Sequence, residues 1–284
     1  MVEIAYSFLP HNSCLYLCKF LKMKCLIISL LLSVTFNMNS ASAQPVTLKQ
    51  VGKTNEYFQK GSPVHYKGAL YTFNFGALYK TDLDSGYCSR LGNSVYKNIR
   101  FFFAINNRLY IIETDGSMLV IDPFTGARKP ESIINTWVNV EQVIVVGNSF
   151  YSFENGVFYY HSALNPDKRK QVGKDEFYNL GALYRSDSKL YSIIDGNFYE
   201  INTGTGAWKK ITKAKSWRSV KAGAILNDKF YSLESDGSLY ETTLSDGTKK
   251  EMDKTQFIKG GFLFAESGKL YTILDGTLYL VSIN

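Results

Sequence analysis

Two stretches near the end of the chain share one pattern: "SGKLYTILDGTLYLVSIN" at residues 267–284 and "NDKFYSLESDGSLYETTLSDGTKKEMD" at residues 227–253. In both, a hydrophobic segment with a central Tyr leads to Asp-Gly, and a second Leu-Tyr segment follows. The earlier copy then runs on into one more strand-like segment, whereas the last copy ends before it. The missing segment raises the question of how the last copy is completed.

The pattern recurs with a period of about forty residues. Successive anchor tyrosines are spaced 39, 41, 40, 40 and 40 residues apart, and each is followed by a glycine and preceded, fourteen positions earlier, by an aromatic residue. The anchors are Tyr71, Tyr110, Tyr151, Tyr191, Tyr231 and Tyr271. A fixed period of this length is the signature of a repeat architecture.

Each copy contains four short hydrophobic segments separated by turn signals, with no helical period. Asp-Gly or Asn-Gly precedes the third segment in five of the six copies, and Phe75-Gly76 stands there in the first. The Asp-Gly and Asn-Gly pairs predict a two-residue turn in which both central residues have positive φ; Phe75-Gly76 is a weaker turn signal. Four strands in forty residues indicate one blade of a β-propeller.

The mature N-terminus supplies the segment that the last copy lacks. "QPVTLKQVG" at residues 44–52 matches the fourth-strand segments of the other copies. We therefore expect an all-β, six-bladed β-propeller over residues 44–284, with four antiparallel strands per blade and the last blade closed by the N-terminal strand. Closure of this kind removes an open sheet end.

Residues 1–43 differ in composition and predict a leader. Lys24 precedes the apolar run Cys25–Phe36, and small residues end at Ala43 in the spacing of a signal-peptide cleavage site. We expect cleavage after Ala43 and export to the periplasm or beyond the cell. The apolar run is shorter than the roughly 20 residues that span a bilayer. Met23 is the favoured true start, and an uncleaved anchor remains an alternative.

The composition and charge of the chain limit the classes of partner that it is expected to bind. Apolar residues make up 45% of the chain and aromatic residues 15%, which favours a sizeable β core. The net charge is +7, or +5 without the leader, because the leader holds three Lys and one Glu. The basic residues repeat along the fourth strands, where Lys discourages edge-to-edge pairing, so no nucleic-acid partner is expected; a polyanion-binding rim is the alternative. Only Cys88 remains in the mature chain, which excludes an internal disulfide.

The aromatic residue at the start of each copy is the first group of candidate ligand-binding residues. Two interpretations stay open: the rings wedge between blades, or some are exposed and stack on a sugar face, with the two tryptophans the best candidates. The six residues are Tyr57, Tyr96, Trp137, Phe177, Trp217 and Phe257.

Polar residues twelve positions before each anchor are the second group. They are expected at the mouth of a central channel, as a hydrated funnel or, less favourably, as weak calcium ligands. They are Gln59, Asn98, Asn139, Asn179, Ser219 and Lys259. His65 and His161 are interpreted as ordinary strand positions, so neither a metal nor another cofactor is expected. No catalytic residue is assigned, which leans against an enzyme.

The repeat resembles the tachylectin and tectonin-like propeller lectins. Three stretches carry the likeness: "NIRFFFAINNRLYII" (98–112), "WRSVKAGAILNDKFYSL" (217–233) and "FIKGGFLFAESGKLYTI" (257–273). The resemblance implies binding of amino sugars or glycan surfaces between blades.

Three functions follow as hypotheses. The first is a secreted, non-catalytic binding propeller that recognises a glycan or a protein partner on one face. The alternatives are a hydrolase or lyase with a site at the central channel, and a purely structural surface protein. We expect a monomer that does not bind a membrane once the leader is removed.

Overall fold

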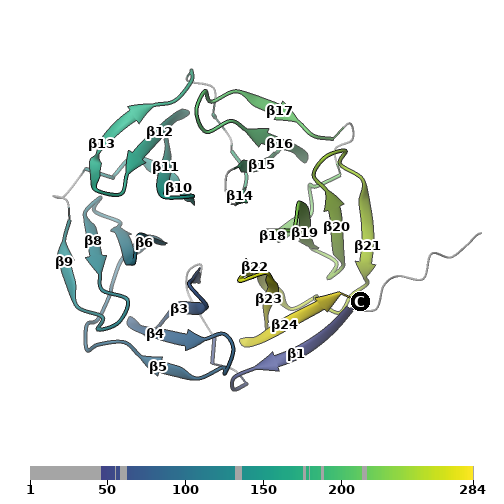
Figure 1. Ribbon diagram of the computed structural model, residues 1–284, viewed down its shortest axis with the longest axis horizontal. Helices are drawn as coiled ribbons and strands as arrows, with labels where there is room; N and C mark the ends of the chain where they lie inside the picture. Colours follow the sequence, from purple (N-terminus) through teal and green to yellow (C-terminus); the bar gives the residue numbers. More distant parts are fainter. Residues whose placement is uncertain are drawn as a thin grey trace, which may run out of the picture. The chain divides into compact units, whose positions relative to one another are not determined.

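The structure is a computed structural model that describes residues 46–54, 56–57, 63–131, 136–174, 177–178, 180–186, 189–212 and 216–283. The predicted leader lies outside these residues. Over them the chain forms 24 strands and no helix. The strands make six four-stranded antiparallel sheets arranged as the blades of a propeller (Figure 1).

Blades 1 to 6 are numbered along the chain, and within each blade the chain runs from the axis outward. The innermost strands are β2 (Val64–Tyr66), β6 (Ile99–Ile105), β10 (Val140–Val146), β14 (Leu183–Arg185), β18 (Val220–Leu226) and β22 (Gly260–Glu266). The second strands are β3 (Ala69–Asn74), β7 (Arg108–Glu113), β11 (Ser149–Glu154), β15 (Leu190–Ile194), β19 (Lys229–Glu234) and β23 (Lys269–Leu274).

The outer half of each blade follows the same order. The third strands are β4 (Ala77–Asp82), β8 (Met118–Ile121), β12 (Val157–Ser162), β16 (Asn197–Ile201), β20 (Leu239–Thr243) and β24 (Thr277–Ile283). The outermost strands are β5 (Cys88–Arg90), β9 (Arg128–Pro130), β13 (Asn165–Gln171), β17 (Trp208–Lys210), β21 (Lys249–Asp253) and, in blade 6, β1 (Val46–Val51).

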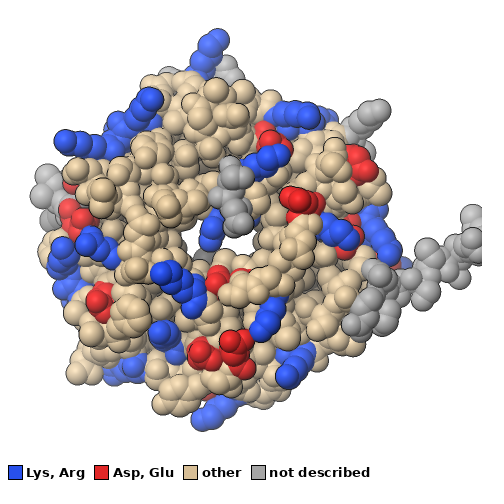
Figure 2. Space-filling view, viewed as in Figure 1, with Lys and Arg blue, Asp and Glu red and all other residues tan. Residues whose placement is uncertain are grey.

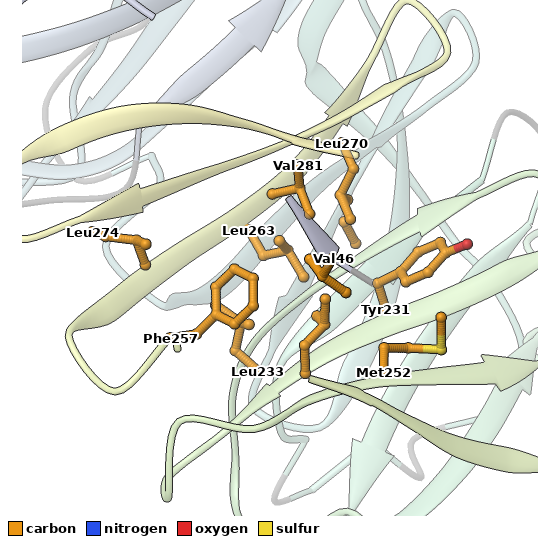
Figure 3. Close-up of a cluster of buried hydrophobic side chains, with 11 residues drawn as sticks. Val46, Tyr231, Leu233, Met252, Phe257, Leu263, Leu270, Leu274 and Val281 are labelled. Atoms are coloured by element: carbon orange, nitrogen blue, oxygen red, sulfur yellow. The ribbon is translucent and has the colours of Figure 1, made fainter. Parts of the chain in front are cut away.

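Blade 6 is closed by the N-terminal strand, as the sequence predicts. β1 pairs antiparallel with β24 over its full length, from Val46 opposite Ile283 to Val51 opposite Leu278. In Figure 1 the first strand lies along the outside of the last one. Val46 also packs against Val281 beside Met252 of blade 5, so the closing strand contributes to an interblade core (Figure 3).

The turns between second and third strands follow the prediction in four blades. In blade 1 both turn residues have positive φ, 48° at Phe75 and 77° at Gly76, even though Phe is a poor residue for this conformation. Blades 3, 4 and 6 have the same arrangement at Asn155-Gly156, Asp195-Gly196 and Asp275-Gly276.

For blades 2 and 5 the two-residue prediction is wrong. There the ladder closes through Glu113 N–H to Ser117 O and Glu234 N–H to Ser238 O, which leaves a loop of three residues. Of the Asp-Gly pair in these loops, only the glycine has positive φ. The Asp side chain instead accepts the backbone N–H two residues on, at 2.9 Å in both loops. Both are three-residue hairpin loops, a type whose last residue is commonly a glycine with positive φ.

Six backbone hydrogen bonds join neighbouring blades at these turns. In every blade the N–H of the aromatic residue at the blade start donates to the turn glycine of the preceding blade, at 2.7–3.2 Å. The pairs are Tyr57–Gly276, Tyr96–Gly76, Trp137–Gly116, Phe177–Gly156, Trp217–Gly196 and Phe257–Gly237. A Cβ on Gly237 would lie 2.6 Å from the backbone N and Cα of Ile258, which explains why this position requires glycine.

Candidate functional site

A cavity of about 820 Å³ lies where the six innermost strands face one another. Most of the residues that line it are apolar, among them Phe102, Val143, Ile225 and Leu263, but polar atoms contribute more of its exposed surface than apolar atoms do. Polar residues line it where innermost strands turn into second strands; they are His65, Arg185, Ser186, Asn227, Asp228, Glu266 and Ser267. The space-filling view shows an opening at the centre of the ring, with charged side chains around it (Figure 2). A concave site where polar groups converge among apolar side chains is a candidate ligand site.

His65 and Glu266 form the best-defined polar pair in this cavity. His65 Nδ1 lies 2.8 Å from Glu266 Oε2, and the Gly68 N–H donates to Oε1 at 3.0 Å. The imidazole stacks on Phe264 with a centroid distance of 5.1 Å. Burial alone would raise the pKa of Glu266, but the hydrogen bonds from His65 and Gly68 outweigh it and lower that pKa. The pair therefore holds an ionised carboxylate and an oriented imidazole at the junction of blades 1 and 6.

Sequence reasoning missed this pair and interpreted His65 as an ordinary strand position. His65 stands six positions before its anchor tyrosine and Glu266 five before its own. At the position of His65 the other blades carry Ala104, Val145, Arg185, Ile225 and Ala265. The available signal in the sequence was this position itself: it carries His65 and Arg185, whereas the other copies carry small or aliphatic residues.

The six aromatic candidates are all buried, with between 1% and 3% of each side chain exposed. Trp137 and Trp217 each belong to a core cluster with residues of two neighbouring blades. Trp137 packs on Phe150 and His161 and donates its Nε1–H to Asp167 at 3.2 Å. Burial of this extent favours the interpretation as wedges between blades, because no ring offers a free face to solvent.

The four polar candidates that the structure describes lie at the opposite ends of the innermost strands from His65 and Glu266. Asn98, Asn139, Ser219 and Lys259 are exposed, and none of the four lines the central cavity. Lys259 pairs with Asp275 in the turn of its own blade at 2.7 Å, and Ser219 donates to Glu234. Gln59 and Asn179 lie outside the described residues.

Blade 3 contains a buried group of Ser, His and carboxylate side chains. His161 Nε2 lies 2.8 Å from Ser152 Oγ, Ser152 donates to Glu154 at 2.8 Å, and Glu154 pairs with Arg169. Burial lowers the pKa of His161 to about 4, so the imidazole is neutral at neutral pH. Ser152 and His161 are both 0% exposed, so a substrate cannot reach them and the group serves the packing of the blade.

The described residues contain neither a metal-binding cluster nor a membrane-spanning helix. No group of three or more His, Cys, Asp or Glu side chains in this part of the chain is placed to hold a metal ion. Within the same residues, no helix has the length and hydropathy needed to cross a membrane.

Comparison with known proteins identifies the fold. No family model and no curated protein matches the chain. The extracellular domain of a putative one-component system from B. thetaiotaomicron aligns at 11% identity with a TM-score of 0.53, covering 85% of this chain and 38% of that one. YCF48 from Cyanidioschyzon merolae aligns at 12% identity with a TM-score of 0.51, covering 77% of this chain and 80% of that one.

PorZ, a surface component of the type-IX secretion system of Porphyromonas gingivalis, aligns at 13% identity with a TM-score of 0.49. That alignment covers 84% of this chain and 34% of PorZ. The chain thus spans little more than a third of PorZ and of the one-component domain. The alignments with the one-component domain and with YCF48 have TM-scores above 0.5 and show that the chain has a propeller fold. At identities this low they show nothing about activity.

Proposed function

We propose that this chain is an exported, non-catalytic binding propeller that recognises its ligand at the central cavity. The observation that carries the proposal is the cavity of about 820 Å³, in which polar groups converge among apolar side chains. A glycan is the preferred ligand, because the largely polar surface can exchange hydrogen bonds with sugar hydroxyls, while apolar side chains such as Phe102 and Leu263 can contact the C–H faces of the ring. A protein partner docked on the same face is the other outcome.

The charges at the polar end support a neutral ligand rather than a polyanion. Arg185 and His65 lie there together with Asp228 and Glu266, so the two signs are mixed. Figure 2 shows blue and red side chains side by side around the opening, without a field of one sign. Export rests on the leader pattern in the sequence, and the B. thetaiotaomicron neighbour is itself an extracellular domain.

A glycan array followed by calorimetry tests this proposal. Glycans that bind the wild type would be titrated against Glu266→Gln and Asp228→Asn, which remove charge at the polar end while keeping side-chain size. Asn also keeps the positive φ of 58° at position 228. We expect each variant to weaken binding about tenfold, the loss of one good hydrogen bond to a charged group. Binding that is unchanged in both variants would exclude the central cavity as the site.

A hydrolase or lyase is the second candidate, and one observation favours it. The carboxylate of Glu266 lies 2.8 Å from Nδ1 of His65, an arrangement that orients an imidazole for proton transfer. A screen of chromogenic glycoside and ester substrates, with and without divalent metals, addresses this activity. Turnover that is lost in His65→Gln would favour the enzyme over the binding protein.

A further inference from the structure

Phe75 is fully exposed and stands at a turn position that suits other residue types. Its exposed fraction is 100% and its φ is 48°. The equivalent positions of blades 3, 4 and 6 carry Asn155, Asp195 and Asp275, whose short polar side chains tolerate positive φ better. Neither the turn nor the core gains from a phenyl ring at this place. A residue that fits neither its backbone conformation nor its exposure points to a contact outside the chain.

A second exposed apolar residue lies beside this turn. Val95 is 51% exposed, and a Cβ added to Gly76 would lie 3.2 Å from its Cγ1. The N–H of Tyr96 donates to the carbonyl oxygen of Gly76 at 2.7 Å, which fixes the segment that contains Val95 against the turn. Phe75 and Val95 therefore form a small apolar patch at the junction of blades 1 and 2, called here the Phe75–Val95 patch.

Two exposed arginines border this patch. Arg90 donates from Nη2 to the carbonyl oxygen of Asn93 at 3.3 Å, and Arg128 donates from Nη1 to that of Val95 at 3.2 Å. Arg128 also lies over the ring of Tyr96, with its Cζ 5.3 Å from the ring centroid. A guanidinium group has five N–H donors, so these contacts orient both side chains and leave donors for a further acceptor.

Arg128 departs from the pattern of the repeat. In blades 3 and 5 the cation at its position forms an ion pair with the glutamate that ends the second strand. These pairs are Arg169–Glu154 and Lys249–Glu234. Blade 2 has a glutamate at that place too, but Glu113 accepts the hydroxyl of Ser117 at 3.2 Å and Arg128 turns to Val95. Within the described part of the chain, neither Arg90 nor Arg128 forms an ion pair.

The chain segment around the patch is basic. Residues 85–112 include Arg90, Lys97, Arg100 and Arg108 and contain no Asp or Glu. This differs from the polar end of the central cavity, where the two signs are mixed. A surface of one sign attracts partners of the opposite charge, and guanidinium groups bind carboxylates with two parallel hydrogen bonds. Apolar surface next to cations therefore suits a partner that is both acidic and apolar.

We propose that the junction of blades 1 and 2 docks an acidic segment of a partner protein. A large apolar side chain of that segment packs on Phe75 and Val95, and its carboxylates bind Arg90 and Arg128. An apolar anchor bordered by arginine contacts is common in protein interfaces. None of these four residues lines the central cavity, so the surface is separate from the proposed ligand site.

Selection from a display library of random short peptides against the exported chain tests the chemistry of the partner. We expect the enriched peptides to share Asp or Glu on either side of a Phe, Leu or Trp. Synthetic versions of these peptides would then be measured with the wild type by fluorescence anisotropy. The inference is overturned if no peptide is enriched, or if the enriched peptides lack acidic residues.

Two variants locate the binding surface. Phe75→Asn should weaken peptide binding about tenfold or more, the scale of a lost aromatic anchor. The same variant should raise the midpoint of urea unfolding, because Asn fits the positive φ at this turn. A purely structural role of Phe75 would not produce these opposite changes. Arg128→Gln keeps a donor for Val95 but removes the charge, and it should weaken binding about two- to fivefold at low ionic strength.

Matched controls make the same kinds of change elsewhere. Leu164→Asn removes an 87% exposed apolar side chain from a turn of blade 3, and Lys250→Gln removes an exposed charge from blade 5. Both should leave the peptide affinity unchanged. Unchanged affinity in Phe75→Asn, or equal losses in the controls, would overturn the inference.

A membrane is the competing occupant, and sedimentation with phosphatidylglycerol vesicles addresses it. Vesicle binding that Phe75→Asn abolishes, together with a selection that enriches no peptide, would assign the surface to a membrane and overturn the inference. Glycan binding at the central cavity, measured by calorimetry in Phe75→Asn, should equal that of the wild type. Loss of glycan binding together with peptide binding in this variant would contradict two separate sites.

Discussion

The backbone N–H of Tyr57 donates to the carbonyl oxygen of Gly276 at 2.8 Å, which joins blade 1 to blade 6. This contact is the sixth member of the ring of interblade hydrogen bonds and the only one that links the two ends of the propeller. It has the same geometry as the five between consecutive blades, so the closed ring has no junction of a different kind at these turns. The pairing of β1 with β24 reinforces the same closure.

Deletion of residues 44–52 should destabilise the propeller. The deletion removes β1, exposes the edge of β24 and takes Val46 and Val51 out of two core clusters. Burial of a valine side chain contributes about 1.5–3 kcal/mol, so the loss should exceed about 3 kcal/mol. Urea unfolding measures it, with a chain that begins at Gln44 as the control. Equal unfolding midpoints for the two chains would contradict closure by β1.

Substitution of Gly237 should be much more costly than substitution of Gly268. Both residues have positive φ, 85° and 73°, which an L side chain disfavours by about 1–2 kcal/mol. Only at Gly237 would a Cβ also collide with the backbone of Ile258; at Gly268 it would meet nothing within 4 Å. We expect Gly237→Ala to cost about 2–4 kcal/mol and Gly268→Ala about 1 kcal/mol in thermal unfolding. Similar losses would argue against close interblade contact at the turn.

The two equivalent tryptophans should respond differently to loss of the indole N–H. Trp137→Phe removes a donor that is bonded to Asp167, whereas Trp217→Phe removes one without a partner among the described residues. The first variant should therefore lose about 1 kcal/mol more stability than the second in chemical denaturation without ligand. Equal losses would indicate that water satisfies Trp217 as well as Asp167 satisfies Trp137.

The repeated parts of the molecule could be predicted from the sequence, because each position of the repeat occurs in six copies. The strand order, the closing strand and the turn glycines follow from that repetition. The extra residue in the turns of blades 2 and 5 was visible too: Gly116 and Gly237 stand six residues after their anchors, and the other turn glycines stand five. Only the φ values show that this spacing changes the turn type.

The candidate site was less predictable because it depends on single departures from the repeat. His65 and Glu266 are 201 residues apart and meet only because the ring closes between blades 6 and 1. The aromatic periodicity favours buried wedges but is compatible with exposed platforms, and burial distinguishes the two. Nothing in the sequence around Leu180 and Gly181 indicates that their carbonyl groups lie outside the strand pairing, since the amide that binds them comes from Gln142 in another blade.

Export should produce a chain that begins at Gln44. We expect Lys24 and the apolar run that follows it to direct secretion, and the small residues that end at Ala43 to define the cleavage site. N-terminal sequencing of exported protein checks the cleavage, and Ala43→Arg should block it. A chain that starts at Met23 should be exported as well as the full one. Soluble cytoplasmic protein that retains Met1 would contradict the leader.

His161 should make the stability of the propeller depend on pH between about 6.5 and 4. Its pKa is about 4 in the folded chain, because burial opposes protonation, and 6.5 without that burial. Below pH 6.5 the unfolded chain therefore binds a proton that the folded chain does not, so stability falls as the pH falls and the loss is complete near pH 4. The difference in pKa corresponds to about 3 kcal/mol over the window.

His161→Gln isolates this contribution, since Gln is polar and of similar length but does not titrate. The variant should be less stable than the wild type at pH 7, because the contacts to Ser152 and Pro166 are altered. Between pH 7 and pH 4.5, however, it should lose about 2–3 kcal/mol less than the wild type does. Urea unfolding at the two pH values measures this difference directly, and carboxylates common to both proteins cancel in it. Parallel losses in the two proteins would mean that the buried imidazole accepts its proton without unfolding the blade.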